Sequence, residues 1–223
     1  RVRLIDSVGY MIPGAVGAEE GGVPRMVTTP WYDHEIPMTQ AAELGTKKVM
    51  DQHASIGLVV TTDGSITDIP RQDYVQAEDR AIRDMKATGK PFLVIINSRH
   101  PGGEAARQVQ QRIEAEHGLQ PITADCQAMD EAGIGELLRS LLYTFPMEKL
   151  EVHLPRWMDA LETGHPVKQA LYQALLEKAE TIHNLGQAET VLAGLGELDL
   201  VQDYSMRGVE LSEGTVVCSI AVP

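Results

Sequence analysis

The sequence predicts an α/β fold, in which a parallel sheet with flanking helices is followed by a smaller α+β domain. Two observations carry this prediction. Up to residue 145, short apolar runs of strand length alternate with longer amphipathic segments, which is the pattern of βαβ units with right-handed crossovers. Beyond Pro146 the alternation ends, and a long amphipathic segment is followed by a strand with a period of two. We therefore expect a first domain over residues 1–147 and a second over residues 148–223.

Four strands and four helices are expected in the first domain. The strands are expected at residues 2–5, 56–61, 92–96 and 121–124, and the helices at 38–53, 73–88, 104–117 and 134–145. The third strand is a continuous apolar run, of the kind that is buried on both faces of a parallel sheet. The fourth helix has its apolar residues at i, i+3, i+4 and i+7, which places them on a single face. Residues 7–37 are rich in Gly and Pro without a regular pattern, and a loop of that length is usually functional.

The second domain has fewer regular segments. Residues 148–154 are expected to be extended, a helical stretch begins at Trp157, and a longer helix covers residues 165–184. Residues 215–222 alternate between apolar and polar side chains, which is typical of a strand with one buried side. The side chains expected on that buried side are Val216, Cys218, Ile220 and Val222.

The composition of the chain argues against several classes of function. The 223 residues include 19 Lys and Arg against 32 Asp and Glu, which gives a formal net charge of −13. Such a surface repels nucleic acid and anionic lipid at long range, so we expect no nucleic-acid partner and no polybasic membrane anchor. The apolar run Phe92–Ile96 is far too short to span a bilayer. The two cysteines, Cys126 and Cys218, are far apart in the sequence, which fits a reducing, cytosolic compartment better than a disulfide framework.

Polar clusters follow each of the four expected strands. They are Asp6, Thr61–Gly64, Asn97–Ser98 and Asp125–Cys126. In open α/β sheets, ligands bind at the carboxyl ends of the strands. We therefore expect the four clusters to surround one binding site.

Asp6 and Gly9 form a D-x-x-G arrangement directly after the first expected strand. In a nucleotide hydrolase, an Asp at this place can hold Mg²⁺ through water. A Gly three residues later lets its backbone N–H approach the γ-phosphate, because no side chain stands in the way. The spacing also fits an ordinary turn that ends a strand. Tyr10 follows where many small GTPases have a water-orienting Gln, so another residue or a neighbouring subunit would have to position the attacking water.

Asn97, Ser98 and Cys126 are the residues expected near the base of a nucleotide. Guanine-specific enzymes carry N-K-x-D after the corresponding strand. Here the run is Asn97-Ser98-Arg99-His100, without the Lys and without the Asp that pairs with guanine. If the site holds a base, the missing Asp favours ATP over GTP. The alternatives are a polar strand end for Asn97 and Ser98, and a small buried residue for Cys126.

Two further groups of polar residues have simpler interpretations. Thr61–Gly64 contains an Asp-Gly pair, which favours a turn. Carboxylate pairs such as Glu19-Glu20 and Glu78-Asp79 are interpreted as solvated faces. The seven histidines are scattered along the sequence, so we predict no metal site made of histidines.

Several longer strings resemble the stage IV sporulation protein A family. They are Arg3-Leu4-Ile5-Asp6-Ser7-Val8-Gly9-Tyr10, Thr29-Pro30-Trp31-Tyr32, Ala41-Ala42-Glu43-Leu44-Gly45-Thr46-Lys47-Lys48-Val49, Val60-Thr61-Thr62-Asp63-Gly64-Ser65-Ile66, Gly89-Lys90-Pro91-Phe92 and Leu154-Pro155-Arg156-Trp157. The resemblance covers nearly the whole chain. It implies an ATPase with a P-loop NTPase, GTPase-like fold that polymerises in the mother-cell cytoplasm, at the outer surface of the forespore, as the basement layer of the spore coat. The implied partners are further copies of itself, a small amphipathic forespore-membrane protein and other coat morphogenetic proteins.

The resemblance also implies roles for individual residues. Asp6 would be the Walker B acid that holds Mg²⁺ through water, and Gly9 would contact the γ-phosphate of ATP. The family's first strand and Walker A loop would precede Arg1, so we expect an incomplete P-loop NTPase domain that neither binds nor hydrolyses ATP by itself. The family's C-terminal domain is likewise expected to lie outside this chain. The alternative is a catalytically inert scaffold that retains a GTPase-like fold. The departure at residues 97–100 disfavours a regulatory GTPase.

Overall fold

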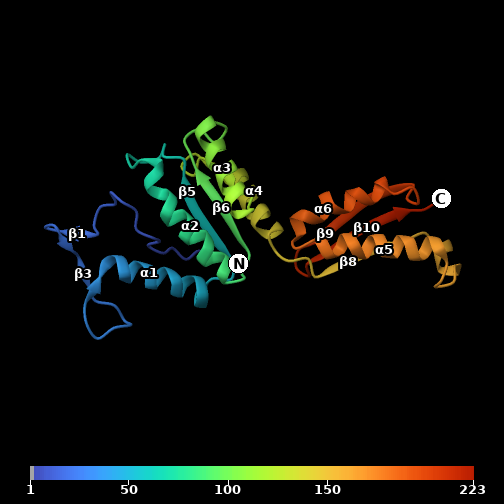
Figure 1. Ribbon diagram of the computed structural model, residues 1–223, viewed down its shortest axis with the longest axis horizontal. Helices are drawn as coiled ribbons and strands as arrows, with labels where there is room; N and C mark the ends of the chain where they lie inside the picture. The colour runs from blue at the N-terminus through green and yellow to red at the C-terminus, as the bar shows by residue number, and fades with distance from the viewer. Residues whose placement is uncertain (1–2) are drawn as a thin grey trace. The chain divides into compact units, whose positions relative to one another are not determined.

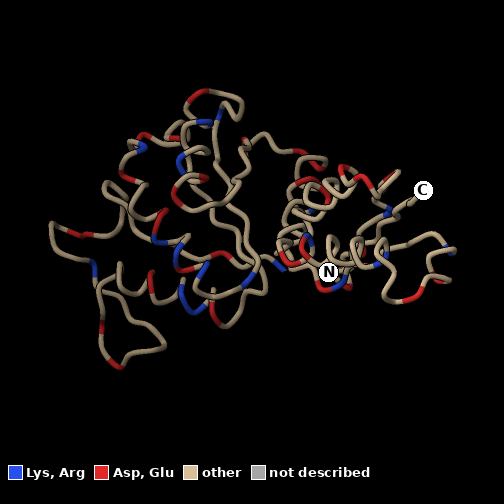
Figure 2. The backbone as a smooth tube through the Cα atoms, turned by 45° about the vertical axis from the view of Figure 1, so that its right-hand side comes forward, with Lys and Arg blue, Asp and Glu red and all other residues tan. Residues whose placement is uncertain are grey.

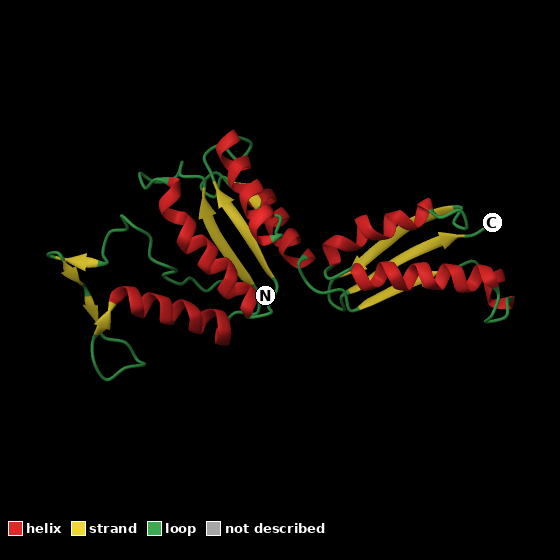
Figure 3. Ribbon diagram, viewed as in Figure 1, coloured by secondary structure: helices red, strands yellow, loops and turns green. Residues whose placement is uncertain are grey.

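The structure confirms the α/β prediction. The computed structural model describes residues 3–223, which divide into two units between Gly133 and Ile134 (Figure 1). The first unit contains a parallel three-stranded sheet with flanking helices, and the second, smaller unit contains a mixed three-stranded sheet (Figure 3). The domain boundary expected between residues 147 and 148 stays a prediction. Among residues 3–223, no helix combines the length and the apolar character needed to cross a bilayer.

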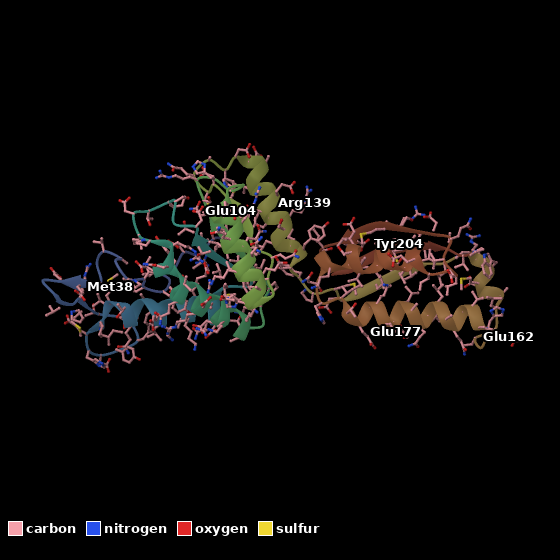
Figure 4. The ribbon with its side chains drawn as sticks, turned by 45° about the horizontal axis from the view of Figure 1, so that its top comes forward. Met38, Glu104, Arg139, Glu162, Glu177 and Tyr204 are labelled. Carbon is pink, nitrogen blue, oxygen red and sulfur yellow. The ribbon has the colours of Figure 1, made fainter. Side chains whose placement is uncertain are left out.

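The sheet of the first unit has the order β5-β6-β7, and its strands are parallel. Its elements are β5 (Gly57–Thr62), β6 (Phe92–Asn97), β7 (Ile122–Ala124) and the helices α2 (Arg71–Ala87) and α3 (Glu104–His117). Residues 93–96 of the middle strand are all buried, as expected from their unbroken apolar run. Both helices pack on one face of the sheet, where Ile82 and Ile113 contact the same buried cluster as Ile96. Glu104 is labelled at the start of α3 in Figure 4.

The helix expected over residues 38–53 is present in two parts. Helix α1 covers Met38–Lys48, and a π-helical turn, η1, continues it over Val49–His53. The loop before α1 is largely irregular, as expected, but it contains two short hairpins. These pair β1 (Glu19–Glu20) with β2 (Val23–Pro24), and β3 (Met26–Val27) with β4 (Ile36–Pro37).

The first expected strand is absent from the part of the chain that the structure describes, so this sheet has three strands instead of four. Val2 lies outside the described residues. Arg3–Ile5 is irregular, and Leu4 is 83% exposed. A strand needs a neighbour that shares its backbone hydrogen bonds. Within residues 3–223, β5 pairs only with β6, so the segment before Asp6 has no strand beside it.

The side chain of Lys90, two residues before β6, forms hydrogen bonds with the end of η1. Its ammonium group donates to the carbonyl oxygens of Met50, Asp51 and Ala54 at 2.7, 2.8 and 2.8 Å. The last carbonyl groups of a helix have no partner within the helix, and a positive charge beside them is favourable. Lys90 therefore satisfies three of these carbonyls at once and joins a helix to the sheet.

Replacing Lys90 by methionine is expected to lower the free energy of unfolding of the first unit by about 1–2 kcal/mol, because three bonds to a charged donor are lost. Urea unfolding followed by the fluorescence of Trp31, in a Trp157→Phe background, measures this change. The control is Lys47→Met, which removes an exposed lysine from α1. If both variants lose the same free energy of unfolding, the hydrogen bonds from Lys90 to η1 contribute no stability beyond that of the positive charge.

The second unit contains a mixed sheet and two helices that pack on one face of it. Its elements are the larger part of α4 (Glu131–Tyr143), which begins in the first unit, β8 (Lys149–His153), the 3₁₀ turn η2 (Arg156–Ala160), α5 (Pro166–Thr181), α6 (Leu185–Ala193), the 3₁₀ turn η3 (Gly194–Glu197), β9 (Asp203–Glu210) and β10 (Thr215–Ala221). The strand order is β8-β10-β9, with β8 parallel and β9 antiparallel to β10. Leu171 of α5 and Leu192 of α6 pack in one core with the sheet. The four residues expected on the buried side of the last strand are all buried, at 0%, 0%, 3% and 7% exposure: Val216, Cys218, Ile220 and Val222.

The sequence does not predict α6 or β9, and the helix expected over residues 165–184 ends at Thr181. Asn184 begins the second helix, because its side-chain oxygen accepts a bond of 3.0 Å from the N–H of Gln187. Helix α6 is short, and β9, on which Tyr204 is labelled in Figure 4, is a partly exposed edge strand. Such segments have weak hydrophobic patterns, which explains why they were not predicted.

Glu78 is buried, which contradicts its interpretation as part of a solvated face. It is 4% exposed and accepts bonds from Arg71 Nη2 at 2.8 and 2.9 Å, from Arg112, and from the hydroxyl of Thr61. A buried carboxylate requires such partners. These bonds join α2 to α3 and to β5. Glu19-Glu20 is exposed, as expected.

Charges of both signs are spread over the described chain (Figure 2). One cluster has the residue types of a metal site, because ligand atoms of Asp79, Glu116 and His117 lie within 4.8 Å of one another. However, Arg112 Nη2 lies 2.7 Å from Asp79 Oδ1 and 2.7 Å from Glu116 Oε2. The carboxylate oxygens that would bind an ion are thus already bonded to Arg112, so the cluster is an ion-pair network.

Candidate functional site

The segment from Asp6 to Gly9 lies along a hollow of about 410 Å³ in the first unit. Asp6 and Gly9 line it together with Thr46 of α1, Thr61 of β5 and Glu78 of α2. The side chain of Asp6 is exposed. Its carboxylate is therefore accessible to a ligand or to the water shell of an ion.

Gly9 has a backbone conformation that suits glycine. Its φ is +78°, in the left-handed region, and a Cβ atom there would meet no other atom within 4 Å. The N–H of Gly9 donates to Oγ1 of Thr46 at 3.0 Å, and the same hydroxyl lies 3.4 Å from the Gly9 carbonyl oxygen. Thr46 is 5% exposed. There is thus open space beside the Cα of Gly9. However, the N–H of Gly9, which is expected to face a γ-phosphate, is bonded to the side chain of Thr46 on α1.

Tyr10 is anchored to α2. Its hydroxyl donates to Asp84, and the guanidinium of Arg80 lies 4.9 Å from the centre of its ring. Burial and the bond to Asp84 raise the pKa of Tyr10 well above its ordinary value of 10.0, so the hydroxyl stays protonated at neutral pH. Arg80 also makes bonds of 2.6 and 2.8 Å with Glu43 of α1. The Tyr10 hydroxyl therefore holds this segment in place.

A second hollow, of about 500 Å³, is also lined by Asp6. Residues 27–31 of the long loop and the side of α1 form much of its wall. The ring of Trp31 lies 3.4 Å from where a Cβ atom on Gly45 would stand, and the ammonium group of Lys48 lies 5.5 Å from the ring centre. Trp31 thus rests on α1 beside the residue that precedes Thr46.

The loops after β5, β6 and β7 meet at the carboxyl ends of these strands. Ser98 is fully buried and donates to Asp63 Oδ2 at 2.6 Å, while the N–H of Cys126 donates to Asn97 Oδ1 at 3.0 Å. The structure therefore brings Asn97, Ser98 and Cys126 to one edge of the sheet. None of the three lines either hollow beside Asp6. The predicted site residues consequently form two separate groups within the described chain.

Asp63 closes the turn after β5, which confirms the prediction of a turn there. Its Oδ1 accepts bonds from the N–H and the hydroxyl of Ser65 at 3.0 and 2.6 Å, and Gly64 has a φ of +92°. Burial raises the pKa of Asp63, but the bonds from Ser65 and Ser98 lower it by more, so this pKa lies below its ordinary value of 3.8.

Acid is expected to weaken this turn. Because the pKa of Asp63 is lower in the folded state, its ionised form stabilises the fold above about pH 4, and this contribution is lost as the pH falls through the folded pKa. Asp63→Asn removes the titration, so its urea stability should fall less between about pH 4 and pH 2 than that of the wild type. Asp68→Asn, at an exposed position of the same loop, is the control and should behave like the wild type. Identical pH dependence in all three proteins would show that Asp63 has no part in acid unfolding.

Cys126 is exposed, which contradicts its interpretation as a small buried residue. Its contact with Asn97 uses the backbone N–H, so the loop position needs no buried side chain. Partial burial and the charge of Asp125 raise the pKa of the Cys126 thiol above 9.0. A protonated thiol is a poor nucleophile, and covalent chemistry at Cys126 is therefore not indicated.

Asp6 and Gly9 fit one side of a magnesium–nucleotide site. An exposed carboxylate is a hard oxygen ligand of the kind that Mg²⁺ takes, directly or through water. The open space before the Cα of Gly9 admits a phosphate that a larger residue would exclude. Thr46, Arg80 and Asp84, which hold this segment, were not predicted from the sequence, because no local motif marks them.

Comparison with known proteins identifies the family of the chain. Residues 1–146 match the family model for the ATPase domain of stage IV sporulation protein A, and residues 147–223 match the model for its middle domain. The chain is 36% identical over 222 residues to stage IV sporulation protein A from Bacillus anthracis and from Bacillus subtilis, covering 100% of this chain and 45% of each relative. It is 37% identical over 216 residues to the protein of the same name from Clostridioides difficile, covering 97% of this chain and 44% of that relative.

The chain spans less than half the length of these curated relatives, at 45% and 44%. No solved structure shows significant similarity to it. The two family models together cover every residue from 1 to 223. The chain therefore belongs to the stage IV sporulation protein A family, and it comprises the regions that match the ATPase and middle domains.

Proposed function

We propose that the full-length protein containing this chain hydrolyses ATP and uses the reaction to polymerise into the basement layer of the spore coat. The observation that carries the proposal is the match of residues 1–146 to the family's ATPase domain. The exposed carboxylate of Asp6 and the open surface of Gly9 support it. The polymer would form in the mother-cell cytoplasm at the forespore surface. Its partners there would be a small amphipathic membrane protein and other coat morphogenetic proteins.

In this mechanism, Asp6 and Gly9 act on the phosphates. Asp6 would hold Mg²⁺ through water, and the N–H of Gly9 would donate to the γ-phosphate of ATP. When bound, Mg²⁺ would supply positive charge beside the phosphates. Tyr10 keeps this segment against α2 through its bond to Asp84. Because Gly9 lies near the start of the long loop of residues 7–37, a change at Gly9 has a short route to the rest of that loop.

The loops after β6 and β7 would contact the base. Asn97 fixes the backbone at Cys126, and Ser98 fixes the loop after β5. This network gives the edge of the sheet a defined shape. Since the chain lacks the Asp that pairs with guanine at residues 97–100, ATP is the expected nucleotide.

Phosphate release by the full-length protein, measured with ATP and with GTP, tests the proposal. We expect turnover of ATP to exceed that of GTP by about tenfold or more, and sedimentable polymer to appear with ATP and Mg²⁺. Chelation of Mg²⁺ with EDTA should stop both ATP turnover and polymer formation. Turnover at background level with either nucleotide would contradict the proposal.

A catalytically inert scaffold is the second candidate function. Two contacts favour it, because the N–H of Gly9 is bonded to Thr46 and the hydroxyl of Tyr10 is bonded to Asp84. The groups nearest to the expected phosphate are thus engaged by the protein itself. Polymer that forms equally well with and without ATP would support the scaffold.

A further inference from the structure

We propose that Thr46 is a latch that competes with the γ-phosphate for the N–H of Gly9, and that this competition couples the position of α1 to nucleotide binding. The inference rests on the proposed function, since it requires a nucleotide at Gly9, and it specifies how that site is regulated. It is carried by the bond between Gly9 and Thr46 and by the contacts that connect α1 to α2 and to the long loop.

The competition follows from a single hydrogen bond. The N–H of Gly9 donates to Oγ1 of Thr46 at 3.0 Å. A backbone N–H carries one proton, so a full-strength bond to a phosphate oxygen excludes the bond to Thr46. Thr46 is 5% exposed, and its hydroxyl has little access to water as a replacement partner. Phosphate binding would therefore take from the buried Thr46 hydroxyl its donor and leave it only the longer contact of 3.4 Å with the Gly9 carbonyl oxygen, unless α1 moves.

The contacts around Gly9 allow α1 to move while the neighbouring residue stays fixed. Tyr10 is held by α2, through Asp84 and the guanidinium of Arg80. On the side of α1, the pair of Arg80 with Glu43 is exposed, at 46% and 36%, and exposed ion pairs contribute little to stability. The following turn, η1, is held more firmly, because Met50 packs in the core cluster that includes Ile82 of α2, and Lys90 binds its carbonyl groups. The fixed points are thus Tyr10 and η1, and the Thr46–Gly9 bond is the contact that breaks.

A movement of α1 would reach the long loop through Trp31. The ring of Trp31 lies against Gly45, the residue before Thr46, and near the ammonium group of Lys48. Residues 27–31 also share the second hollow with α1 and Asp6. The latch therefore provides a physical route from the phosphate to a loop that is largely irregular and largely exposed.

The first test compares the full-length wild type with Thr46→Val and Thr46→Ser, using a non-hydrolysable ATP analogue with Mg²⁺ as the ligand. Valine has nearly the shape of threonine but no hydroxyl, whereas serine keeps the hydroxyl. We expect Thr46→Val to bind the analogue about three- to tenfold more tightly than the wild type, because the competing bond is gone. Thr46→Ser should bind like the wild type. Equal or weaker binding by Thr46→Val would overturn the latch, because a residue that only supports the fold cannot improve affinity when it is replaced.

The second test needs no variant, so it holds even if Thr46→Val folds poorly. Amide hydrogen exchange is measured on the full-length wild type with and without saturating analogue. We expect faster exchange in peptides from residues 38–53 when the analogue is bound. Binding of the analogue without any change in these peptides would overturn the latch alone. No binding by the wild type at millimolar analogue would overturn both the latch and the proposed ATPase.

Discussion

Replacing Glu78 by alanine is expected to lower the free energy of unfolding of the first unit by about 2–4 kcal/mol. The Glu78 side chain is 1% exposed and is paired with Arg71 and Arg112. Removing the carboxylate takes from Arg71 the carboxylate with which it is paired, whereas Arg112 keeps its pairs with Asp79 and Glu116. A second nitrogen of Arg71, Nη1, is buried without a hydrogen-bond partner within the described residues, so this arginine depends strongly on Glu78. The arginine side chains are 20% and 23% exposed, so water recovers part of the loss.

Fluorescence can assign this loss to the first unit, because Trp31 lies there and Trp157 lies in the second unit. Urea unfolding of Glu78→Ala in the Trp157→Phe background follows Trp31 alone. Glu116→Gln is the matched control, since that carboxylate also pairs with an arginine but is 50% exposed. Its loss should stay within about 0.5 kcal/mol. If Glu78→Ala costs no more than the control, the buried ion pairs do not hold α2 to α3 and β5.

Local patterns predict the elements whose burial is set by their own sequence. The continuous apolar run of β6 is buried on both faces, and the alternating run of β10 is buried on one. Residues 3–5 were wrongly expected to be a strand, because a strand also needs a neighbour, which no local pattern reveals. The burial of Glu78 is hidden from local patterns for a similar reason. Arg71 lies 7 residues away on the same helix, but Arg112 is 34 residues away on α3, and only the fold brings it to Glu78.

The candidate site likewise contains some residues that the sequence identifies and others that only the structure identifies. The spacing of Asp6 and Gly9 is visible in the sequence, and so are the polar residues that end β6 and β7. The contacts that position Gly9 and Tyr10 come from Thr46 and Asp84, which are 37 and 74 residues away. Their types carry no signal, because threonine and aspartate are common on helices that face a sheet or solvent. Motifs can thus identify groups that meet a ligand, while the residues that hold those groups require a structure.

Replacing Asp6 by alanine in the full-length protein is expected to reduce ATP turnover by about a hundredfold or more and to prevent polymer formation. The proposed role of Asp6 is to hold Mg²⁺ through water, so its loss removes a negative charge from the metal site. Asp6 is exposed and lies in an irregular segment. The stability of the fold should therefore change by no more than about 0.5 kcal/mol, and lost turnover cannot be attributed to unfolding.

The matched control is Asp33→Ala, which removes an exposed aspartate from the long loop and should leave turnover near that of the wild type. Asp6→Asn keeps an oxygen ligand without the charge and should fall between Asp6→Ala and the wild type. If turnover and polymer are lost together in Asp6→Ala, hydrolysis drives assembly through this residue. If turnover is lost but polymer still forms, Asp6 belongs to the ATPase site and assembly has a separate cause. Normal turnover in Asp6→Ala would contradict the site itself, because no other residue in the D-x-x-G segment from Asp6 to Gly9 carries a carboxylate.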